Sequence, residues 1–474
     1  MMQNKVRIGL LGVGLDTYWG QFEGLLPRLL AYQEEICAGI EQMDVEVVNV
    51  GIVDSPQKAG ESALLLKQAD VEFVFLFIST YALSSTVLPV AQQVGKPVIM
   101  LNMQPVPAID YQKVNSMGDR GKMTGEWLAH CQACSVPEFA SVFNRSGIRY
   151  DIITGYLSDQ LAWKEIASWV DAARAVDGMR KNRLGILGHY YCGMLDVYTD
   201  VMQQSAIFGT HVELLEMCEL KAYRDEVTDV DLKRKLNEFY DKFDVETSCE
   251  SDELVRAART SVALDKLVET HRLGAMAYYY EGFNGNDYEN IVTSVIAGNT
   301  LLTGYGIPVA GECEVKNAQA MKIMSLLKAG GSFSEFYAMD FNDDIVMLGH
   351  DGPAHFAIAE EKVKLVPLPL YHGKPGKGLS IQMTVKPGNV TLLSVCEGKD
   401  GVFLLAAEGE SVQGETLHIG NTNSRYRFPC GARRFMDMWS KAGPSHHCAI
   451  GVGHKVSELK KLAFLLNIPI VVIE

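Results

Sequence analysis

Two glutamates and two histidines in the last third of the chain could together hold a divalent metal ion. Glu312 and His350 each follow an apolar run, Glu335 follows a glycine pair, and His447 is the second histidine of a pair. Two carboxylates and two imidazoles form a mixed oxygen and nitrogen donor set. Such a set suits Mn²⁺, Co²⁺ or Fe²⁺ with positions open to a substrate better than it suits a closed structural zinc site.

Spacing alone makes this metal hypothesis weak, because the four residues are far apart in the sequence. Taken singly, a glutamate is more often a solvated surface group, and a histidine pair in a loop is more often exposed than a ligand. Two other motifs also invite a chemical role. Gly9–Gly14 follows a strand but lacks the third glycine of a dinucleotide fingerprint, so we expect no NAD site. Cys131 and Cys134 lack a second cysteine or histidine pair, which favours reduced, mostly buried thiols.

The composition is that of an ordinary globular protein. The chain has 474 residues, of which 47% are hydrophobic, and its formal net charge is −15. A length prior of roughly 100–200 residues per domain predicts about three domains. The negative charge disfavours binding to nucleic acid or to anionic lipid. The apolar run at 73–78 is far shorter than the ~18 residues of a membrane helix, and the amino terminus has no signal-peptide architecture, so we expect a cytoplasmic protein.

Positioning the four candidate ligands would require two kinds of fold. Up to about residue 330, short apolar strands alternate with amphipathic helices, which indicates parallel sheets covered by helices on both faces. After that point, short strands separated by Gly, Pro and Asp-rich turns predict an antiparallel sheet or small barrel, including a strand at Ser411–Ile419. The sequence thus predicts two doubly wound α/β domains, 1–181 and 182–330, followed by a β-barrel-like domain, 331–474, with a closing helix and strand.

Several blocks of the last third resemble the L-arabinose isomerase family. The family's G-Y-G-x-A-G-E-G-D stretch is similar to the segment Gly304–Glu314. Its G-G-(T)-S-F-x-E-D-Y stretch is similar to Gly330–Tyr337, and N-D-x-V-L-G-S-H is similar to Asn342–His350. The I-A-A-E-E-K block and the late G-A-H-H block also have counterparts, at Ile358–Lys362 and Pro444–His447. These blocks occur in the family's order, and the match is clear over the last third of the chain.

The resemblance implies a ligand set and a mechanism. By motif, the family's Mn²⁺ ligands fall on Glu312, Glu335, His350 and His447, with Co²⁺ or Mg²⁺ as alternative ions. The same two glutamates, Glu312 and Glu335, would carry a proton between C1 and C2 of a sugar. The family also implies a trimer-based hexamer in which a neighbouring subunit completes each active site.

Positions that resemble the family's contacts to the far end of the sugar are rewritten here. They carry Asp16, Tyr81, Asp119, Arg120 and Tyr280, with Lys122 and His189 close by in sequence and His446 beside the metal ligand. Larger and more polar groups predict a substrate other than L-arabinose, such as a 6-deoxy or C6-substituted hexose. Arg120 and Lys122 could pair with an anionic substituent, or they could be solvated residues at the start of a helix.

The sequence therefore predicts a metal-dependent aldose–ketose isomerase that acts through an enediolate. A divalent ion would act as Lewis acid and template, and two carboxylates would move the proton. A metal-dependent epimerase or hydrolase on the same framework is an alternative, and so is a sugar-binding protein with a degenerate site.

Overall fold

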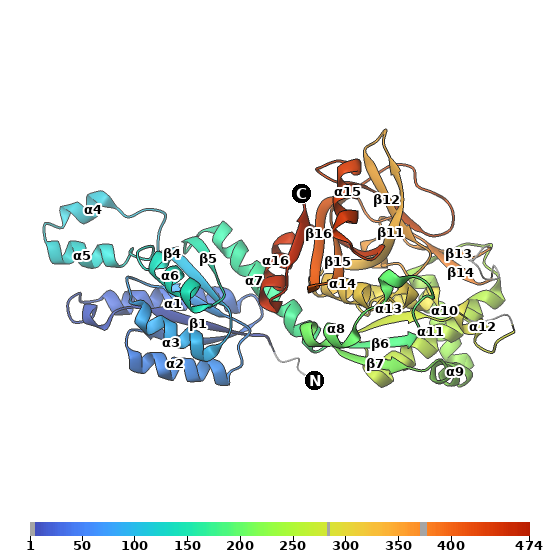
Figure 1. Cartoon of the computed structure of the whole chain (residues 1–474), viewed down its shortest axis with the longest axis horizontal. Coiled ribbons are helices and arrows are strands. Elements are labelled where there is room, and N and C mark those ends of the chain that lie inside the picture. The colour runs from blue at the N-terminus through green and yellow to red at the C-terminus, as the bar shows by residue number, and fades with distance from the viewer. Residues whose placement is uncertain (1–4, 282–284, 370–376) are drawn as a thin grey trace. The chain divides into compact units, whose positions relative to one another are not determined.

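The computed structural model describes residues 5–281, 285–369 and 377–474. By their internal contacts these residues form two compact units, Met1–Asp177 and Gly178–Glu474, with the boundary inside helix α7 (Gln160–Arg180) (Figure 1). The first boundary of the predicted three-domain division lies close to this one. The division of the remainder into two domains stays a prediction, because residues 178–474 pack as one unit.

The first unit is a five-stranded parallel sheet in the order β2-β1-β3-β4-β5. Its central strand, β3, reads Val-Phe-Leu-Phe-Ile and is buried throughout, as expected where helices cover both faces. The strands are β1 (Arg7–Val13), β2 (Glu46–Val53), β3 (Val74–Ile78), β4 (Val98–Gln104) and β5 (Tyr150–Tyr156). The helices are α1 (Leu25–Glu41), α2 (Pro56–Gln68), α3 (Ser84–Val94), α4 (Tyr111–Ser116), α5 (Arg120–Leu128) and α6 (Val136–Ser146).

The second unit begins with a four-stranded parallel sheet in the order β10-β9-β6-β7. These strands are β6 (Arg183–Gly188), β7 (His211–Leu215), β9 (Ala275–Tyr279) and β10 (Val309–Ala310). The helices around the sheet are α8 (Val201–Phe208), α9 (Met217–Asp225), α10 (Asp229–Lys242), α11 (Ser251–His271), α12 (Glu289–Val292) and α13 (Ile296–Gly304). The carboxyl ends of β6, β9 and β10 meet at one edge, where open α/β sheets bind ligands.

Six antiparallel strands of the second unit close into a barrel, which confirms the predicted fold class. The order is β15-β18-β11-β12-β17-β16, and pairing of β16 with β15 closes the ring. The strands are β11 (Gly330–Asp340), β12 (Ile345–His350), β15 (Gly388–Gly398), β16 (Gly401–Val412), β17 (Thr422–Arg427) and β18 (His447–Val452). Strand β19 (Ile470–Ile473) adds to β16 in parallel. A core cluster of the described residues joins this barrel to the helices that surround it.

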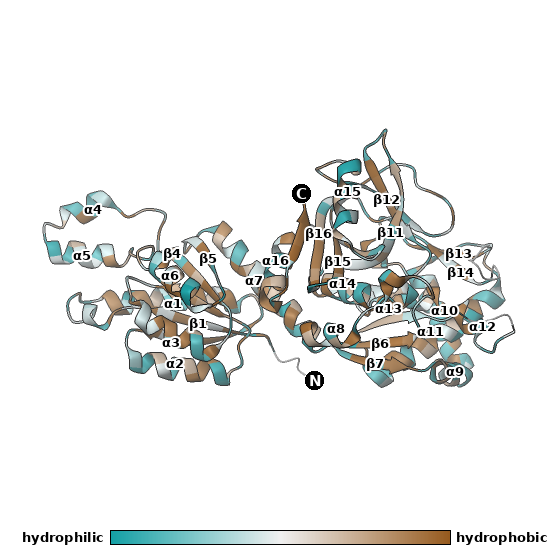
Figure 2. Cartoon of the chain, in the orientation of Figure 1, coloured by the Kyte–Doolittle hydropathy of each residue, from teal (hydrophilic) through white to brown (hydrophobic). Residues whose placement is uncertain are grey.

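Helix α14 (Val315–Leu326) runs between the parallel sheet and the barrel and is buried on all sides, polar Lys316, Asn317 and Gln319 included. Helix α15 (Ala432–Ala442) is amphipathic and α16 (Val456–Leu466) precedes β19. A small sheet of β8 (Asp244–Val245), β13 (Lys364–Pro367) and β14 (Leu379–Gln382) lies beside the barrel. In Figure 2, strands β6 and β7 are mostly brown, whereas α15 carries hydrophilic teal turns.

Two predicted elements differ from the structure. The predicted strand at Ser411–Ile419 is wrong, because β16 ends at Val412 and the next strand begins at Thr422. Gly414, with a φ of 150°, lies inside this run, and Gly420, with a φ of 80°, directly follows it. Such positive φ values interrupt the pairing of a strand with its neighbours. The sequence predicts a loop at His446–His447, but His447 is the first residue of strand β18. Within the described ranges, no helix is both long and apolar enough to span a bilayer.

Candidate metal centre

The four candidate ligands lie where strands of the second unit end or pair. Glu335 in β11 lies directly opposite His447 in β18, and on its other side it pairs with Gly349 of β12. His350 is the last residue of β12, and Thr422 holds its backbone: the His350 N–H donates to Oγ1 at 2.9 Å, and that hydroxyl donates to the His350 carbonyl at 3.1 Å. The barrel register therefore fixes three of the four ligands.

Glu312 comes from the other half of the unit. It follows β10 in a single 3-10 turn (η3, Gly311–Cys313) and has a left-handed backbone, with φ 54°. The Tyr191 N–H donates to the Glu312 carbonyl at 3.3 Å. A left-handed conformation in a residue other than glycine costs of order 1–2 kcal/mol, and such strain collects at functional sites.

The structure brings Glu312, His350 and His447 together around one point. The fourth candidate, Glu335, belongs to a second group that shares His447. Possible ligand atoms of Glu312, His350 and His447 lie within 4.8 Å of one another, and so do those of Glu335, His446 and His447. Oε2 of Glu312 is 3.4 Å from Nε2 of His447, and Oε1 is 3.9 Å from Nε2 of His350. Neither group includes a cysteine; Cys131 is buried, Cys134 is exposed, and both thiols are free.

The rings of the two buried histidines, His350 and His447, pack against the ring of Phe333. The Phe333 ring centroid lies 4.4 Å from the ring centroids of both His350 and His447. Gly311 and Gly352 leave room for this arrangement. A Cβ at Gly311 would come within 2.8 Å of the Phe333 ring, and one at Gly352 within 3.1 Å of the His350 Nδ1.

Protonation favours metal binding. Burial lowers the pKa of both His350 and His447 to about 3, so both imidazoles are neutral. Burial opposes ionisation of Glu312, but the hydrogen bond and the charge of the neighbouring His446 outweigh it and hold the pKa of Glu312 below the usual range. Nε2 of His447 has no hydrogen-bond partner among the described residues. A buried, neutral nitrogen that faces a carboxylate without a partner fits a metal ligand.

A carboxylate that the sequence analysis did not assign orients His447. Oε2 of Glu314 lies 2.5 Å from Nδ1 of His447, and both side chains are fully or almost fully buried. Burial raises the pKa of Glu314 to about 7, against the opposing effects of Ser445 and Lys316. A carboxylate behind a metal-binding histidine fixes its tautomer and leaves the other nitrogen for the ion. The only sequence signal was a second acidic residue two positions after Glu312.

His446 points to the same centre but is held by a different carboxylate. Oδ2 of Asp196, in the 3-10 turn η2 (Leu195–Val197), accepts from the His446 backbone N–H at 3.0 Å and lies 2.6 Å from its Nδ1. Nε2 of His446 lies 3.4 Å from Oε2 of Glu312. The carboxylates of Glu312 and Asp196 raise the pKa of His446 to about 9, so this ring is an imidazolium at neutral pH.

Two hollows flank the centre. One has about 860 Å³ of empty space; Glu312, His350 and Asp351 line it on one side, and Tyr191, Tyr279 and Ile296 contribute apolar walls. The other has about 620 Å³ and is lined by Glu335, His446 and Asp196. A small polyhydroxylated molecule with an apolar face would fit such surroundings.

Of the predicted substrate contacts in this unit, His189 and Tyr280 lie beside each other at the sheet edge that also carries Glu312. Their ring centroids are 5.6 Å apart. The aromatic residues that line the larger hollow are instead Tyr191, Tyr278 and Tyr279, which were not among the predicted contacts. The ring centroids of Tyr191 and Tyr279 lie 4.7 Å apart. Their position could have been anticipated only from the alternation of side chains around the strand end.

The other predicted contacts belong to the first unit. Asp16 is exposed and accepts from the Thr17 N–H at 2.7 Å, and Tyr81 packs against a small apolar cluster. Asp119 is the N-cap of α5 and accepts from the Lys122 N–H at 2.9 Å. Arg120 and Lys122 are exposed in the first turn of that helix. Asp119 and Lys122, with Arg28 and Glu126, line a hollow of about 1240 Å³ within this unit.

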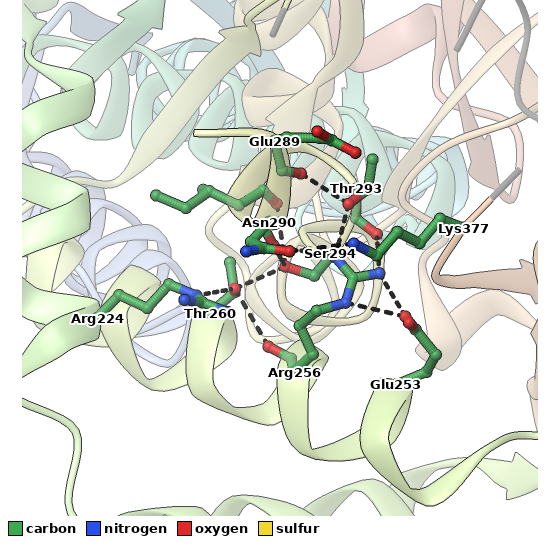
Figure 3. A network of polar contacts seen from close by, with 10 residues as sticks. Arg224, Glu253, Arg256, Thr260, Glu289, Asn290, Thr293, Ser294 and Lys377 are labelled. Carbon is green, nitrogen blue, oxygen red and sulfur yellow. Dashed lines mark hydrogen bonds and ion pairs between the residues drawn. The ribbon is translucent and has the colours of Figure 1, made fainter. Parts of the chain in front are cut away.

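A polar network supports the wall of the larger hollow (Figure 3). Arg256 on α11 donates to the Asn290 carbonyl at 3.0 Å and to the Thr293 hydroxyl at 2.6 Å, and Glu253 is its ion-pair partner. Thr260 lies 2.7 Å from the Ser294 hydroxyl, and Arg224 donates to Thr260 at 2.9 Å. The network fastens the turn around α12 to α11, immediately before Val295 and Ile296 of the wall.

Comparisons with known proteins point to one family of enzymes. Residues 198–330 match the family model for the L-arabinose isomerase central domain, and residues 330–469 match the model for the C-terminal domain. The L-arabinose isomerase of Nocardioides sp. is 23% identical over 393 residues, which are 80% of this chain and 76% of that protein. The enzymes of the same name from Aeromonas salmonicida and Klebsiella pneumoniae are 19% and 22% identical, covering 85% and 71% of this chain and 80% and 69% of their own lengths. Among solved structures, a periplasmic solute-binding protein from Actinobacillus succinogenes with bound D-allose is 12% identical and matches over 65% of this chain and 78% of its own. The TM-score is 0.17, which is too low to bear on the fold or the site.

Proposed function

Because the chain belongs to the L-arabinose isomerase family, as a divergent member, we propose that it is a metal-dependent aldose–ketose isomerase. The observation that carries the metal dependence is the cluster of Glu312, His350 and His447, in which two neutral buried imidazoles face one ionised carboxylate. We propose Glu335 as the fourth ligand, since it lies opposite His447 in the barrel. We propose Mn²⁺ as the ion, as the resemblance to the family implies, with Co²⁺ or Mg²⁺ as alternatives.

The two carboxylates supply the proton transfers. When bound, a divalent ion would polarise the carbonyl and stabilise negative charge on the two sugar oxygens. One of Glu312 and Glu335 would take the proton from C2 of the aldose and a proton would be delivered to C1, while the proton of the O2 hydroxyl would pass to O1, which completes the ketose. Each glutamate keeps one oxygen for this task only if it binds the ion through the other. His446, held as an imidazolium by Asp196, is placed to donate to a sugar oxygen.

The substrate that we propose is a sugar other than L-arabinose. The rewritten positions Asp16, Tyr81, Asp119, Arg120 and Tyr280 favour a hexose with a 6-deoxy or C6-substituted end. The described lining residues of both hollows beside the metal candidates include no lysine or arginine. An anionic substituent would therefore depend on Arg120 and Lys122 of the first unit, supplied within a trimer-based hexamer by a neighbouring subunit.

The test is an aldose-to-ketose assay with a panel of pentoses, 6-deoxyhexoses and C6-charged hexoses, with EDTA and after addition of Mn²⁺. We expect conversion that EDTA abolishes and Mn²⁺ restores best. Full turnover by a chelated, metal-free preparation would exclude the metal mechanism. A kcat/KM for L-arabinose at least about ten-fold above the other sugars would overturn the substrate assignment and leave the chemistry intact. Epimerised or hydrolysed products would favour the second candidate class, in which the same ion activates another step.

A further inference from the structure

We propose that Asp196 is a positioning residue that sets the orientation of the His446 ring against Glu312. The inference rests on the proposed isomerase function for its kinetic consequences, and on distances alone for the orientation. Asp196 lies in the segment after β6, whereas His446 precedes β18, and the two are 250 positions apart in the sequence. The parallel-sheet half of the unit thus reaches across to a residue of the barrel.

The contacts define one orientation. Oδ2 of Asp196 lies 2.6 Å from Nδ1 of His446 and accepts from the backbone N–H of the same residue at 3.0 Å. A ring and its own backbone held by one oxygen leave little freedom for the side-chain torsions. Nε2 is thereby directed to Oε2 of Glu312, 3.4 Å away, and into the ligand group that His446 forms with Glu335 and His447.

Asp196 is itself fixed from the opposite side. Its carbonyl accepts from the Ser445 hydroxyl at 3.2 Å and from Nζ of Lys316, which is almost fully buried at 5% relative exposure. Ser445 is the residue before His446. The carbonyl of Asp196 therefore binds Ser445, and its carboxylate binds the next residue, His446. Side chains that must be held within about 0.5 Å for catalysis need such supporting contacts.

The orientation can be tested without any assay of turnover. Crystal structures of Asp196→Ala and Asp196→Asn, compared with one of the unchanged chain, would report the distance from Nε2 of His446 to Oε2 of Glu312. Because both hydrogen bonds end on Oδ2, a single amide oxygen can accept both. We expect the ring to keep its place in Asp196→Asn and to leave it in Asp196→Ala. A ring that stays in place in Asp196→Ala would overturn the proposal, whatever reaction the protein catalyses.

Kinetics then test whether the orientation matters, through a double-mutant cycle. Asp196→Ala should lower kcat about ten-fold or more with KM changed less than about three-fold, and Asp196→Asn should recover most of the loss. In a His446→Ala background, Asp196→Ala should lower kcat less than about two-fold, because the two residues act as a unit. Asp200→Ala, which removes only the N-cap of α8 a few residues along, is the matched control and should leave kcat unchanged. Equal losses in both backgrounds would show a general structural role and overturn the inference. A parent chain without isomerase activity would instead count against the proposed function.

Discussion

At the scale of single residues, Glu314 determines which nitrogen of His447 faces the candidate metal centre. Its carboxylate lies against Nδ1 of the ring, so Nε2 alone faces Glu312 and the centre. Nε2 of His447 has no hydrogen-bond partner among the described residues. Removing the carboxylate would free the ring to change tautomer and to tilt, and would leave a buried Nδ1 without a partner.

We expect Glu314→Ala to weaken Mn²⁺ binding by about 10–100-fold, as is typical for the carboxylate behind a ligand histidine. Glu314→Gln keeps an acceptor oxygen at the same place and should be milder. Isothermal titration calorimetry of the purified full chain measures both. The exposed Glu415, changed to Ala, is the control. Unchanged Mn²⁺ affinity in Glu314→Ala would argue against His447 as a ligand.

Replacing Glu312 or Glu335 with Gln should lower turnover by at least ~10²-fold, since an amide binds metal weakly and cannot carry a proton. His446→Ala should lower turnover and leave Mn²⁺ affinity nearly unchanged, whereas His447→Ala should abolish metal binding. Turnover and titration calorimetry on the same preparations distinguish the two histidines. If His446→Ala lost Mn²⁺ binding and His447→Ala kept it, His446 and not His447 would be the metal ligand of the pair.

How much of the site could be predicted from sequence depends on the kind of contact. The residue types of Glu312, His350 and His447 already indicate metal chemistry, and the family motif supplies their positions. Glu314 and Asp196 could not be assigned, because their partners are 133 and 250 positions away and meet them only in the folded unit. Hydrogen bonds of this range leave no periodic pattern in the sequence.

At the scale of elements, the wall of the larger hollow depends on a helix that does not touch it. Arg256 of α11 supports the turn around α12 through two carbonyls and the Thr293 hydroxyl, and Val295 and Ile296 follow that turn directly. Loss of the guanidinium would remove a donor from each of these acceptors, and among the described residues only the Asn290 carbonyl would keep another side-chain donor, the Ser294 hydroxyl at 2.6 Å. The expected cost is about 1–3 kcal/mol.

Arg256→Met should therefore raise KM for the best sugar by about five-fold or more while kcat falls less than about three-fold, because the wall contacts substrate and the metal ligands stay in place. Steady-state kinetics on the sugar identified by the substrate panel measure both constants. Arg234→Met removes an exposed arginine of α10 and should change neither constant. A fall in kcat alone would show that the network acts on the centre and not on the wall.

The end of α11 should make stability depend on pH. Nδ1 of His271 lies 2.6 Å from Glu213 of β7, and Nε2 lies 2.8 Å from Glu219 of α9. Glu219 and Glu213 raise the pKa of His271 above its ordinary value of about 6.5. The stabilisation is therefore fully present below about pH 6.5 and is lost as the pH rises through the folded-state pKa.

We expect His271→Gln to lower Tm by roughly 1–2 °C at pH 6 and by much less at pH 9.5, since the groups are partly solvated. Scanning calorimetry at both values measures the difference, with the exposed His211→Gln on β7 as control. A Tm loss in His271→Gln that is as large at pH 9.5 as at pH 6 would exclude the ionic contribution.

The elements themselves were largely predictable, because alternation and helical periodicity survive in a single sequence. Strand β3 and helix α11 each bury an apolar set, in line with the predicted alternation of apolar strands and amphipathic helices up to about residue 330. The closure of the barrel was not predictable in detail. Strand β17 reads Thr-Asn-Ser-Arg-Tyr-Arg, a polar run whose buried hydroxyls and amides are satisfied by neighbouring strands and loops. Because β17 is polar, a prediction based on hydrophobic patterns does not identify it as a strand.

At the scale of the whole molecule, the proposed site residues are divided between two compact units. The four metal candidates, His189, Tyr280 and His446 belong to Gly178–Glu474, and Asp16, Tyr81, Asp119 and Arg120 belong to Met1–Asp177. If neighbouring subunits complete each other's sites, a chain defective in one unit should complement a chain defective in the other.

We expect co-expression of a Glu312→Gln chain with an Asp16→Ala/Arg120→Ala chain to restore about a quarter of parental activity, because a random mixture pairs two intact halves in that share of sites. Each variant expressed alone should be nearly inactive. Differently tagged chains, purified through both tags, give the mixed oligomers for the assay. Activity no higher than that of the separate variants would place both halves of the site in one chain.

The pairing of Glu335 with His447 has a further consequence for how this protein could change over time. If β11 or β18 shifted by one residue, the side chains of Glu335 and His447 would point to opposite faces of the sheet. Because β15 pairs with β16 and closes the barrel, such a shift would also break hydrogen bonds between other strands. The turns at the sheet edge and the exposed start of α5 are under no such constraint. Under the proposed function, the candidate metal ligands and the proposed sugar contacts are thus separable parts, and a change in loop sequence would alter the choice of sugar without altering the paired Glu335 and His447.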